Sequence, residues 1–79
     1  MKDQIVEILE DINPDVDYST CTTLIDDRHL DSLSMVSLIA ELEDAFDITI
    51  PAVEVVTDNF NSLDAICSLV ERLAEEEED

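Results

Sequence analysis

The chain has 79 residues, enough for one small domain, and 46% of them are hydrophobic, so it can bury a core. Three basic residues against 22 acidic ones give a net charge of −19, which excludes nucleic acid and anionic membrane surfaces as direct partners because both need a basic surface. No apolar run approaches the roughly 20 residues that cross a bilayer, and the charged start is unlike a secretion signal, so we expect a cytoplasmic protein without membrane insertion.

Residues 3–12 are predicted to form the first helix. Their apolar side chains are spaced i, i+3, i+4, i+7 and share one face: Ile5, Ile8, Leu9 and Ile12. The helix is expected to end before Pro14, because the residue preceding a proline avoids the helical conformation. A long acidic connection then runs to Leu30. A loop of that length in so small a domain is typically functional or crosses the bundle.

The clearest helix is predicted over residues 32–46, with Asp31 as its N-cap and Ser32 in its first turn. Its core stripe consists of apolar residues at helical spacing: Met35, Leu38, Ile39, Leu42 and Phe46. A second apolar row lies beside Ser32 on a neighbouring face: Leu33, Val36 and Ala40. A helix with so wide an apolar surface can bury one part of it in the bundle, while the remaining apolar strip stays available to a partner.

A short third helix is predicted over 52–56, because a proline precedes it and suits a first helical turn. Asn61 and Asp64 resemble a capping box that opens a fourth helix over 62–74. The buried stripe of that helix is expected to be Leu63, Ile66, Cys67, Val70 and Leu73. The acidic tail 75–79 should fray, since its charges repel one another.

This pattern predicts an all-α fold. Three long helices, one short third helix and a long loop between the first two form a small four-helix bundle. The whole chain, 1–79, is expected to be a single, monomeric domain.

The residue content argues against an enzyme. Phosphate-cradling loops need glycine, and the chain has none. His29 lies near acids and Ser32, but a hydrolytic site also needs a pocket and oxyanion donors, for which a small bundle has little volume. Acids alternate from Asp11 as in an EF-hand, yet Val16 and Thr22 occupy the positions that require glycine and glutamate. We therefore expect no catalytic residue and no metal site.

Two hypotheses remain for Ser32. A serine near a helix start is commonly just a capping residue, and the chain would then be an acidic helical adaptor without a prosthetic group. Alternatively, a phosphodiester on Ser32 would lie at the positive end of the helix dipole, near unpaired backbone N–H groups and above the second apolar row.

The tripeptide Asp31-Ser32-Leu33, at the start of an acidic second helix, resembles the acyl carrier proteins. The tripeptide alone is common, but length, charge and helix plan match as well, and the resemblance extends through residues 24–27, 43–46 and 50–51. It implies that Ser32 carries a 4′-phosphopantetheine arm between Asp31 and Leu33, and that the thiol of the arm holds the cargo as a thioester. It also implies a separate Mg²⁺-dependent phosphopantetheinyl transferase, which delivers the arm from coenzyme A.

Three positions depart from the common family pattern. Arg28 stands where members usually have glycine, and places a positive charge close to the expected phosphodiester. Ser34 and Ser37 stand where fatty-acid carriers usually have acids. The residues after the second helix look more like D-alanyl carriers and other stand-alone carriers: 46–48, 50–51, Glu54, Asp58 and 60–62.

The sequence therefore predicts a non-catalytic carrier that shuttles a thioester between enzymes. The cargo could be fatty acyl, polyketide or aminoacyl, and a D-alanyl or aminoacyl carrier is the alternative within the family. The implied partners are the transferase, an acyl- or aminoacyl-adenylating ligase, and synthase or transferase enzymes of lipid or secondary-metabolite biosynthesis. They are expected to dock on the second helix, at Leu33, Val36, Ala40, Glu41, Asp44 and Asp47.

Overall fold

The structure is a computed structural model that describes residues 2–77, in which helices are joined by loops and there is no strand. Its elements are α1 (Lys2–Ile12), α2 (Ser32–Phe46), the 3-10 turn η1 (Ala52–Glu54), α3 (Thr57–Phe60) and α4 (Leu63–Glu77). This confirms the predicted all-α, four-helix bundle. Of the helices described, none has both the length and the apolar character to cross a membrane.

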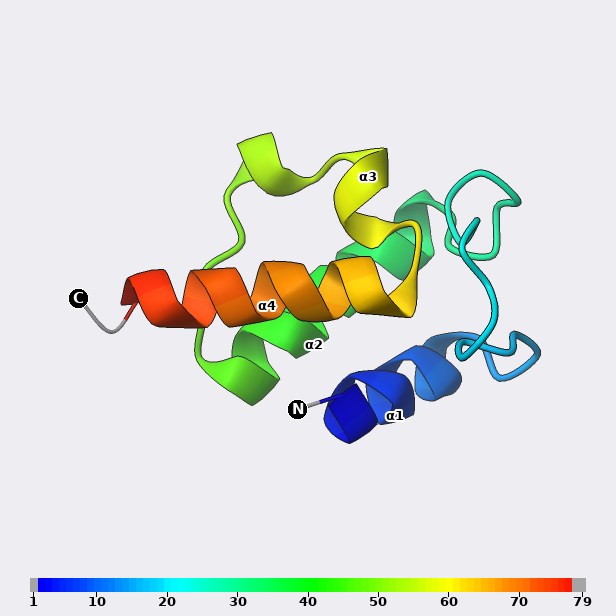
Figure 1. Ribbon diagram of the computed structural model, residues 1–79, viewed down its shortest axis with the longest axis horizontal. Coiled ribbons are helices and arrows are strands. Elements are labelled where there is room, and N and C mark those ends of the chain that lie inside the picture. Colours follow the sequence, from blue (N-terminus) through cyan, green and yellow to red (C-terminus); the bar gives the residue numbers. More distant parts are fainter. Residues whose placement is uncertain (1, 78–79) are drawn as a thin grey trace.

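The three long helices pack against one another. Contacts join α1 to α2, α1 to α4 and α2 to α4, while α3 packs on α4. Figure 1 shows α1 on one side of α4, and η1 with α3 on the other side. The long loop between α1 and α2 closes one end of the bundle (Figure 1).

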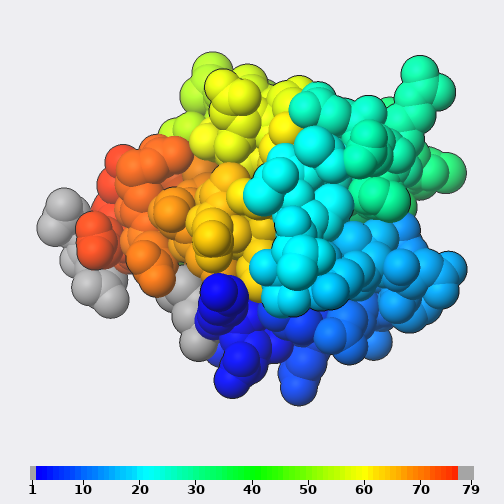
Figure 2. Space-filling view, turned by 45° about the vertical axis from the view of Figure 1, so that its right-hand side comes forward, coloured from blue at the N-terminus to red at the C-terminus, as the bar shows by residue number. Residues whose placement is uncertain are grey.

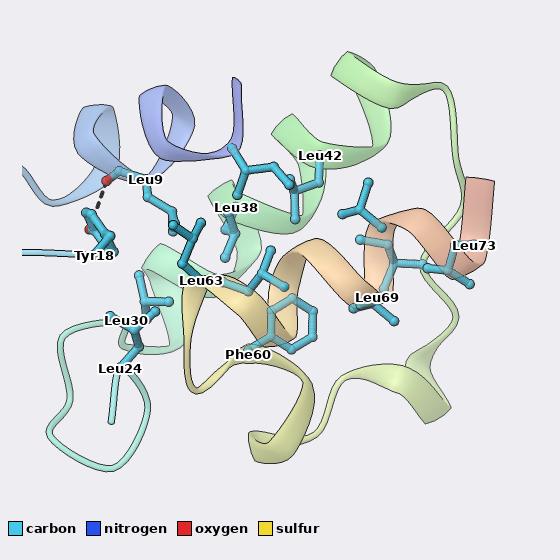
Figure 3. Close-up of a cluster of buried hydrophobic side chains, with 14 of the residues drawn as sticks. Leu9, Tyr18, Leu24, Leu30, Leu38, Leu42, Phe60, Leu63, Leu69 and Leu73 are labelled. Atoms are coloured by element: carbon cyan, nitrogen blue, oxygen red, sulfur yellow. Dashed lines mark hydrogen bonds between the residues drawn. The ribbon is translucent and has the colours of Figure 1, made fainter. Parts of the chain in front are cut away.

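One hydrophobic core joins α1, α2, α3, α4 and the long loop, and Figure 3 shows the side chains of α2 and α4 meeting within it. Its buried members are Ile5, Leu9, Tyr18, Leu24, Leu30, Leu38, Leu42, Ile48, Ile50, Phe60, Leu63, Ile66, Leu69, Val70 and Leu73. Met35, Ile39 and Phe46, expected in the core stripe of α2, pack against this core but are only partly buried. The fully buried face of α2 is therefore narrower than the sequence pattern indicated.

The third helix differs from the prediction. Residues 52–56 were expected to be one helix, but η1 ends at Glu54 and a separate turn, α3, follows. Val55 and Val56 lie between them, and the backbone of Val56 is extended (φ −129°, ψ 156°). Two successive β-branched valines disfavour a helix, because their χ1 rotamers are restricted against the preceding turn. The chain therefore makes two short turns in place of one helix.

The fourth helix also begins and ends differently. Its N-terminus is capped by Ser62, whose hydroxyl accepts the Ala65 backbone N–H at 3.1 Å, so the predicted capping box of Asn61 and Asp64 was wrong. The helix continues to Glu77, so residues 75–77 are helical and were not expected to be. Glutamate is a good helix former, which outweighs the repulsion among these acids. Residues 78–79 of the tail lie outside the described residues.

Asn61 instead ties the long loop to the bundle. Its side-chain oxygen accepts the backbone N–H groups of Ile25 (2.9 Å) and Asp26 (3.3 Å), and its backbone oxygen accepts the N–H of Leu24 (2.8 Å). Its amide group donates to the Asp26 carboxylate at 3.0 Å. Figure 2 shows the cyan part of the loop lying between α1 and the yellow region that contains α3. These bonds hold the segment that leads into α2.

A second set of contacts fixes the start of the same loop. The Tyr18 hydroxyl lies 3.0 Å from the carbonyl oxygen of Leu9 and 2.7 Å from that of Asn13 (the Leu9 contact is dashed in Figure 3). The Asn13 side chain donates to the carbonyl oxygen of His29 at 3.0 Å, which links the two ends of the loop. The loop is therefore an ordered part of the fold.

Among the described residues, most carboxylates have no cation beside them. Two ion pairs occur among residues 2–77, Lys2 with Asp64 and Arg72 with Glu54, whereas the chain has 22 acidic residues. A compact state with a net charge of −19 concentrates the repulsion among them. Folding stability should therefore depend on ionic strength.

We expect the melting temperature to rise with NaCl and to rise further with millimolar Mg²⁺ or Ca²⁺. Salt near 0.15 M shortens the Debye length to about 8 Å, and divalent ions can lie between neighbouring carboxylates such as Asp26 and Asp27. Screening should add about 1 kcal/mol to the free energy of unfolding, or roughly 4–8 °C in melting temperature. Circular dichroism melts across a salt series measure it. A melting temperature that neither NaCl nor Mg²⁺ changes would contradict this expectation.

Candidate functional site

Ser32 is the first residue of α2, and Asp31 precedes it as the N-cap. The Asp31 backbone is extended (φ −85°, ψ −176°), and its carboxylate accepts the Ser34 backbone N–H at 2.8 Å. Hydrogen bonds from the backbone and the hydroxyl of Ser34 hold the pKa of Asp31 below its usual range. Asp31 is therefore ionised at neutral pH and caps the helix by itself.

The Ser32 side chain is exposed, and no group among residues 2–77 forms a hydrogen bond with its hydroxyl. The backbone N–H groups of Ser32 and Leu33 belong to the first helical turn, which has no preceding carbonyls to accept them. The hydroxyl thus has no base to activate it within the described chain. It is, however, open to a group brought by another molecule, at a helix end that favours negative charge.

The turn that leads into α2 passes through Arg28, whose backbone is left-handed (φ 61°). The Arg28 N–H donates to the Ile25 carbonyl at 3.0 Å, and the Leu30 N–H donates to the Leu24 carbonyl at 3.0 Å. A side chain in this conformation crowds its own backbone, whereas glycine adopts it freely. Arginine therefore makes this turn in a conformation that glycine adopts freely, at a cost in stability.

Arg28→Gly should stabilise the protein by about 0.5–1 kcal/mol, or roughly 2–8 °C in melting temperature, because it removes the strain of the left-handed conformation. Arg28→Ala is the matched control: it removes the same charge but keeps a Cβ, so it should give no such gain. Urea denaturation of the three proteins measures the difference. Equal stability of the Gly and Ala variants would show that the side chain adds no strain at this turn.

A surface groove of about 400 Å³ lies beside Ser32. Its lining comes from the end of the long loop, from α2 and from the segment after η1: Ile25, Leu30, Asp31, Ser32, Met35, Val36, Ile39, Val55, Val56 and Thr57. Met35 and Ile39 are partly exposed because they face this groove as well as the core. Residues 55–57 were not predicted as part of the site, although a run of valines on a short acidic segment could have indicated an exposed apolar wall.

The outer surface of α2 carries the other predicted site residues. Leu33 is 80% exposed and Val36 is 67% exposed, and Ala40 lies on the same helical face. Glu41, Asp44 and Asp47 are also exposed; Asp47 ends the helix in a left-handed conformation (φ 52°). Val36 alone belongs both to this surface and to the groove lining.

The family model for the phosphopantetheine attachment site matches residues 3–70, which include the whole of α2 and the groove. The chain belongs to the phosphopantetheine-binding carrier proteins. Members of this family carry a covalently attached 4′-phosphopantetheine, and the chain therefore holds acyl or aminoacyl groups as thioesters on that arm. The resemblance described from the sequence is confirmed.

Several full-length carrier proteins are similar to this one. The D-alanyl carrier protein of Lactococcus lactis subsp. cremoris (strain MG1363) is 33% identical over 78 residues, which cover 96% of this chain and 99% of that protein. The D-alanyl carrier protein of Streptococcus sanguinis (strain SK36) is 36% identical over 74 residues, 92% of this chain and 94% of that protein. No solved structure matches the chain significantly. The similarity to carriers outside the fatty-acid group agrees with the sequence pattern after α2.

Proposed function

We propose that the chain is a cytoplasmic, non-catalytic aminoacyl carrier of the D-alanyl type, with the phosphopantetheine arm on Ser32. The attachment site is supported by the position of the Ser32 hydroxyl: it is exposed at the N-terminus of α2, beside the groove, and has no hydrogen bond to any other described residue. Support for the cargo comes from the nearly full-length similarity to D-alanyl carrier proteins.

The residues around Ser32 fit the prosthetic group. The positive end of the helix dipole at the first turn of α2 favours a phosphodiester on the hydroxyl. The groove beside it has mainly apolar walls, including Met35, Val36 and Val56, which suit the methyl and methylene groups of the pantetheine chain. When bound, the group supplies a thiol that holds the cargo as a thioester.

A separate phosphopantetheinyl transferase must attach the arm, because no described side chain is placed to deprotonate Ser32. A ligase that adenylates the amino acid would then load the thiol, and an acceptor enzyme would unload it. Tethering raises the effective concentration of the cargo at each partner, so recognition can rest on the protein surface. The chain itself therefore provides the attachment site for the arm, positions the arm and presents a surface on which the enzymes dock.

The docking surface proposed for these enzymes is the exposed face of α2, named here the α2 docking face. It combines an apolar strip with outer acids: Leu33, Val36, Ala40, Glu41, Asp44 and Asp47. Any enzyme that reaches Ser32 must cover Leu33 and Val36, which are close to it in the first turns of α2. Basic residues of the partner would meet the acids and speed association.

The loading reaction tests the proposed cargo. The protein is first converted with coenzyme A, Mg²⁺ and a transferase, and then incubated with ATP, D-alanine and a D-alanine-adenylating ligase. We expect intact-mass spectrometry to show one alanyl group, removable by hydroxylamine, and none on protein without the arm. A second reaction, with a fatty-acyl ligase and its fatty acid in place of the D-alanine ligase and D-alanine, is run in parallel. Loading by the fatty-acyl ligase alone would overturn the aminoacyl assignment while keeping the carrier role.

A further inference from the structure

The segment from Pro51 to Val56 forms one side of the site but has little packing of its own. No residue of η1 is buried, and Val53 is 82% exposed. The backbone hydrogen bonds of the 51–56 segment join residues two or three positions apart: Glu54 N–H to Pro51 O (2.9 Å), Val55 N–H to Ala52 O (3.1 Å) and Val56 N–H to Glu54 O (2.9 Å). Such bonds shape the turn but do not attach it to the rest of the bundle. In Figure 1, η1 stands apart from α4 between two extended connections.

The side chain of Glu54 provides an attachment. Arg72 of α4 donates to both of its carboxylate oxygens, at 2.6 and 3.0 Å. Asn59 of α3 donates to the Glu54 carbonyl oxygen at 2.8 Å and to its carboxylate at 3.3 Å. The hydrogen bonds from Arg72 lower the pKa of Glu54, so the pair stays charged at neutral pH. A two-point pair has a defined geometry, unlike most exposed ion pairs.

The position of this pair connects it to the site. Val55, Val56 and Thr57 follow Glu54 directly, and all three line the groove beside Ser32. On the α2 side, the same groove is lined by Met35, Val36 and Ile39. The ion pair therefore holds the start of a segment whose next residues face the attachment point.

We propose that Glu54 and Arg72 are positioning residues: their ion pair fixes the 51–57 segment against α4, and thereby sets the groove wall that the arm and the transferase meet. The inference rests on the arm being attached at Ser32, as proposed above. Arg72 is one of three basic residues in a chain with 22 acidic ones. Of the other two, Lys2 pairs with Asp64 and Arg28 lies in the turn before α2. Loss of either partner should loosen the segment while the core, built from other residues, remains folded.

The chain offers a matched control in its other ion pair. Lys2 and Asp64 lie 3.5 Å apart, joined by one contact, with side chains 63% and 89% exposed. Glu54→Gln and Asp64→Asn remove the same charge, as do Arg72→Gln and Lys2→Gln. The exchanged pair Glu54→Arg with Arg72→Glu keeps the net charge and can restore the contact.

The first measurement is backbone hydrogen exchange at Val55 and Val56, compared with Leu42 in the core. Glu54→Gln and Arg72→Gln should accelerate exchange of the two valine amides about threefold to tenfold relative to Leu42, whereas the control variants should change it less than about twofold. The exchanged pair should return most of the protection. Equal acceleration at all three amides, or in the control variants, would overturn the proposal.

The second measurement separates positioning from stability. With coenzyme A and a transferase, Glu54→Gln and Arg72→Gln should raise KM for the carrier about threefold to tenfold and leave kcat within about twofold, with recovery in the exchanged pair. Unchanged KM would overturn the role of the pair at the site.

Neither the hydrogen-exchange nor the KM measurement uses an amino acid, so a failed D-alanine loading does not affect the test of the ion pair. If Ser32 is not the attachment site, the transferase will still modify the Ser32→Ala variant. That result differs from an unchanged hydrogen exchange and from an unchanged KM, so the two failures can be told apart.

Discussion

Ser32→Ala should abolish phosphopantetheine attachment completely while the protein stays folded. The hydroxyl is the group that would form the phosphodiester, and no other serine lies at this helix end beside the groove. Its removal should change the free energy of unfolding by at most about 0.5 kcal/mol, because the side chain is exposed and Asp31 caps the helix. Intact-mass spectrometry after incubation with coenzyme A, Mg²⁺ and a transferase measures attachment, and circular dichroism measures folding.

Ser37→Ala is the matched control for this experiment. Ser37 is also exposed on α2, five positions after Ser32. Removal of its hydroxyl should leave the extent of phosphopantetheine attachment at the level of the parent protein. Modification of the Ser32→Ala protein would place the arm on another residue. Failure of the parent with several transferases would contradict the proposed attachment at Ser32.

The fold class and the carrier family could be predicted because their signals are local. In α2, a capping aspartate, an apolar repeat and the tripeptide around Ser32 lie within a few turns of one another. The structure adds that Asp31 accepts the Ser34 N–H, which is the bond expected of an N-cap. Helix type and phase follow from such short-range patterns, and so does the exposure of Leu33 and Val36.

The parts that were missed depend on contacts between distant residues. Asn61 had a plausible local role as a helix cap, but its side chain bonds Ile25 and Asp26, more than thirty positions away. Glu54 and Arg72 are 18 positions apart, and no periodic pattern relates them. The groove likewise joins residues of α2 with Val55 and Val56, which were assigned to one short helix. Pairings of this kind follow from tertiary packing, which a single sequence does not display.

A substitution on the α2 docking face should strongly impair the reaction with the transferase. Val36→Asp should reduce kcat/KM of the transferase at least about tenfold, because it places an unpaired charge in the centre of the apolar contact. The fold should be preserved, since Val36 is 67% exposed and the buried face of α2 is held by Leu38 and Leu42. A melting temperature close to that of the parent would show that the loss arises at the contact.

Val53→Asp provides the comparison for this variant. Val53 is 82% exposed on η1 and does not line the groove, so the same substitution there should have a smaller effect. A larger effect at Val53 would move the docking surface from α2 to η1. Deletion of residues 75–79 is the second comparison, because it removes acids from the C-terminal end of the sequence. If the deletion slows the transferase more than Val36→Asp does, the docking face is wrongly placed.

Asp44→Lys tests the electrostatic part of the same face. Outer charges govern association more than the strength of the final contact, so this reversal should lower the association rate constant and flatten its dependence on salt. Glu7→Lys, on the exposed surface of α1, changes the net charge by the same amount and serves as the control. If the acids act only through the total charge of −19, both reversals slow association equally. A greater effect at Asp44 means that partners approach along α2, where the apolar strip leads to Ser32.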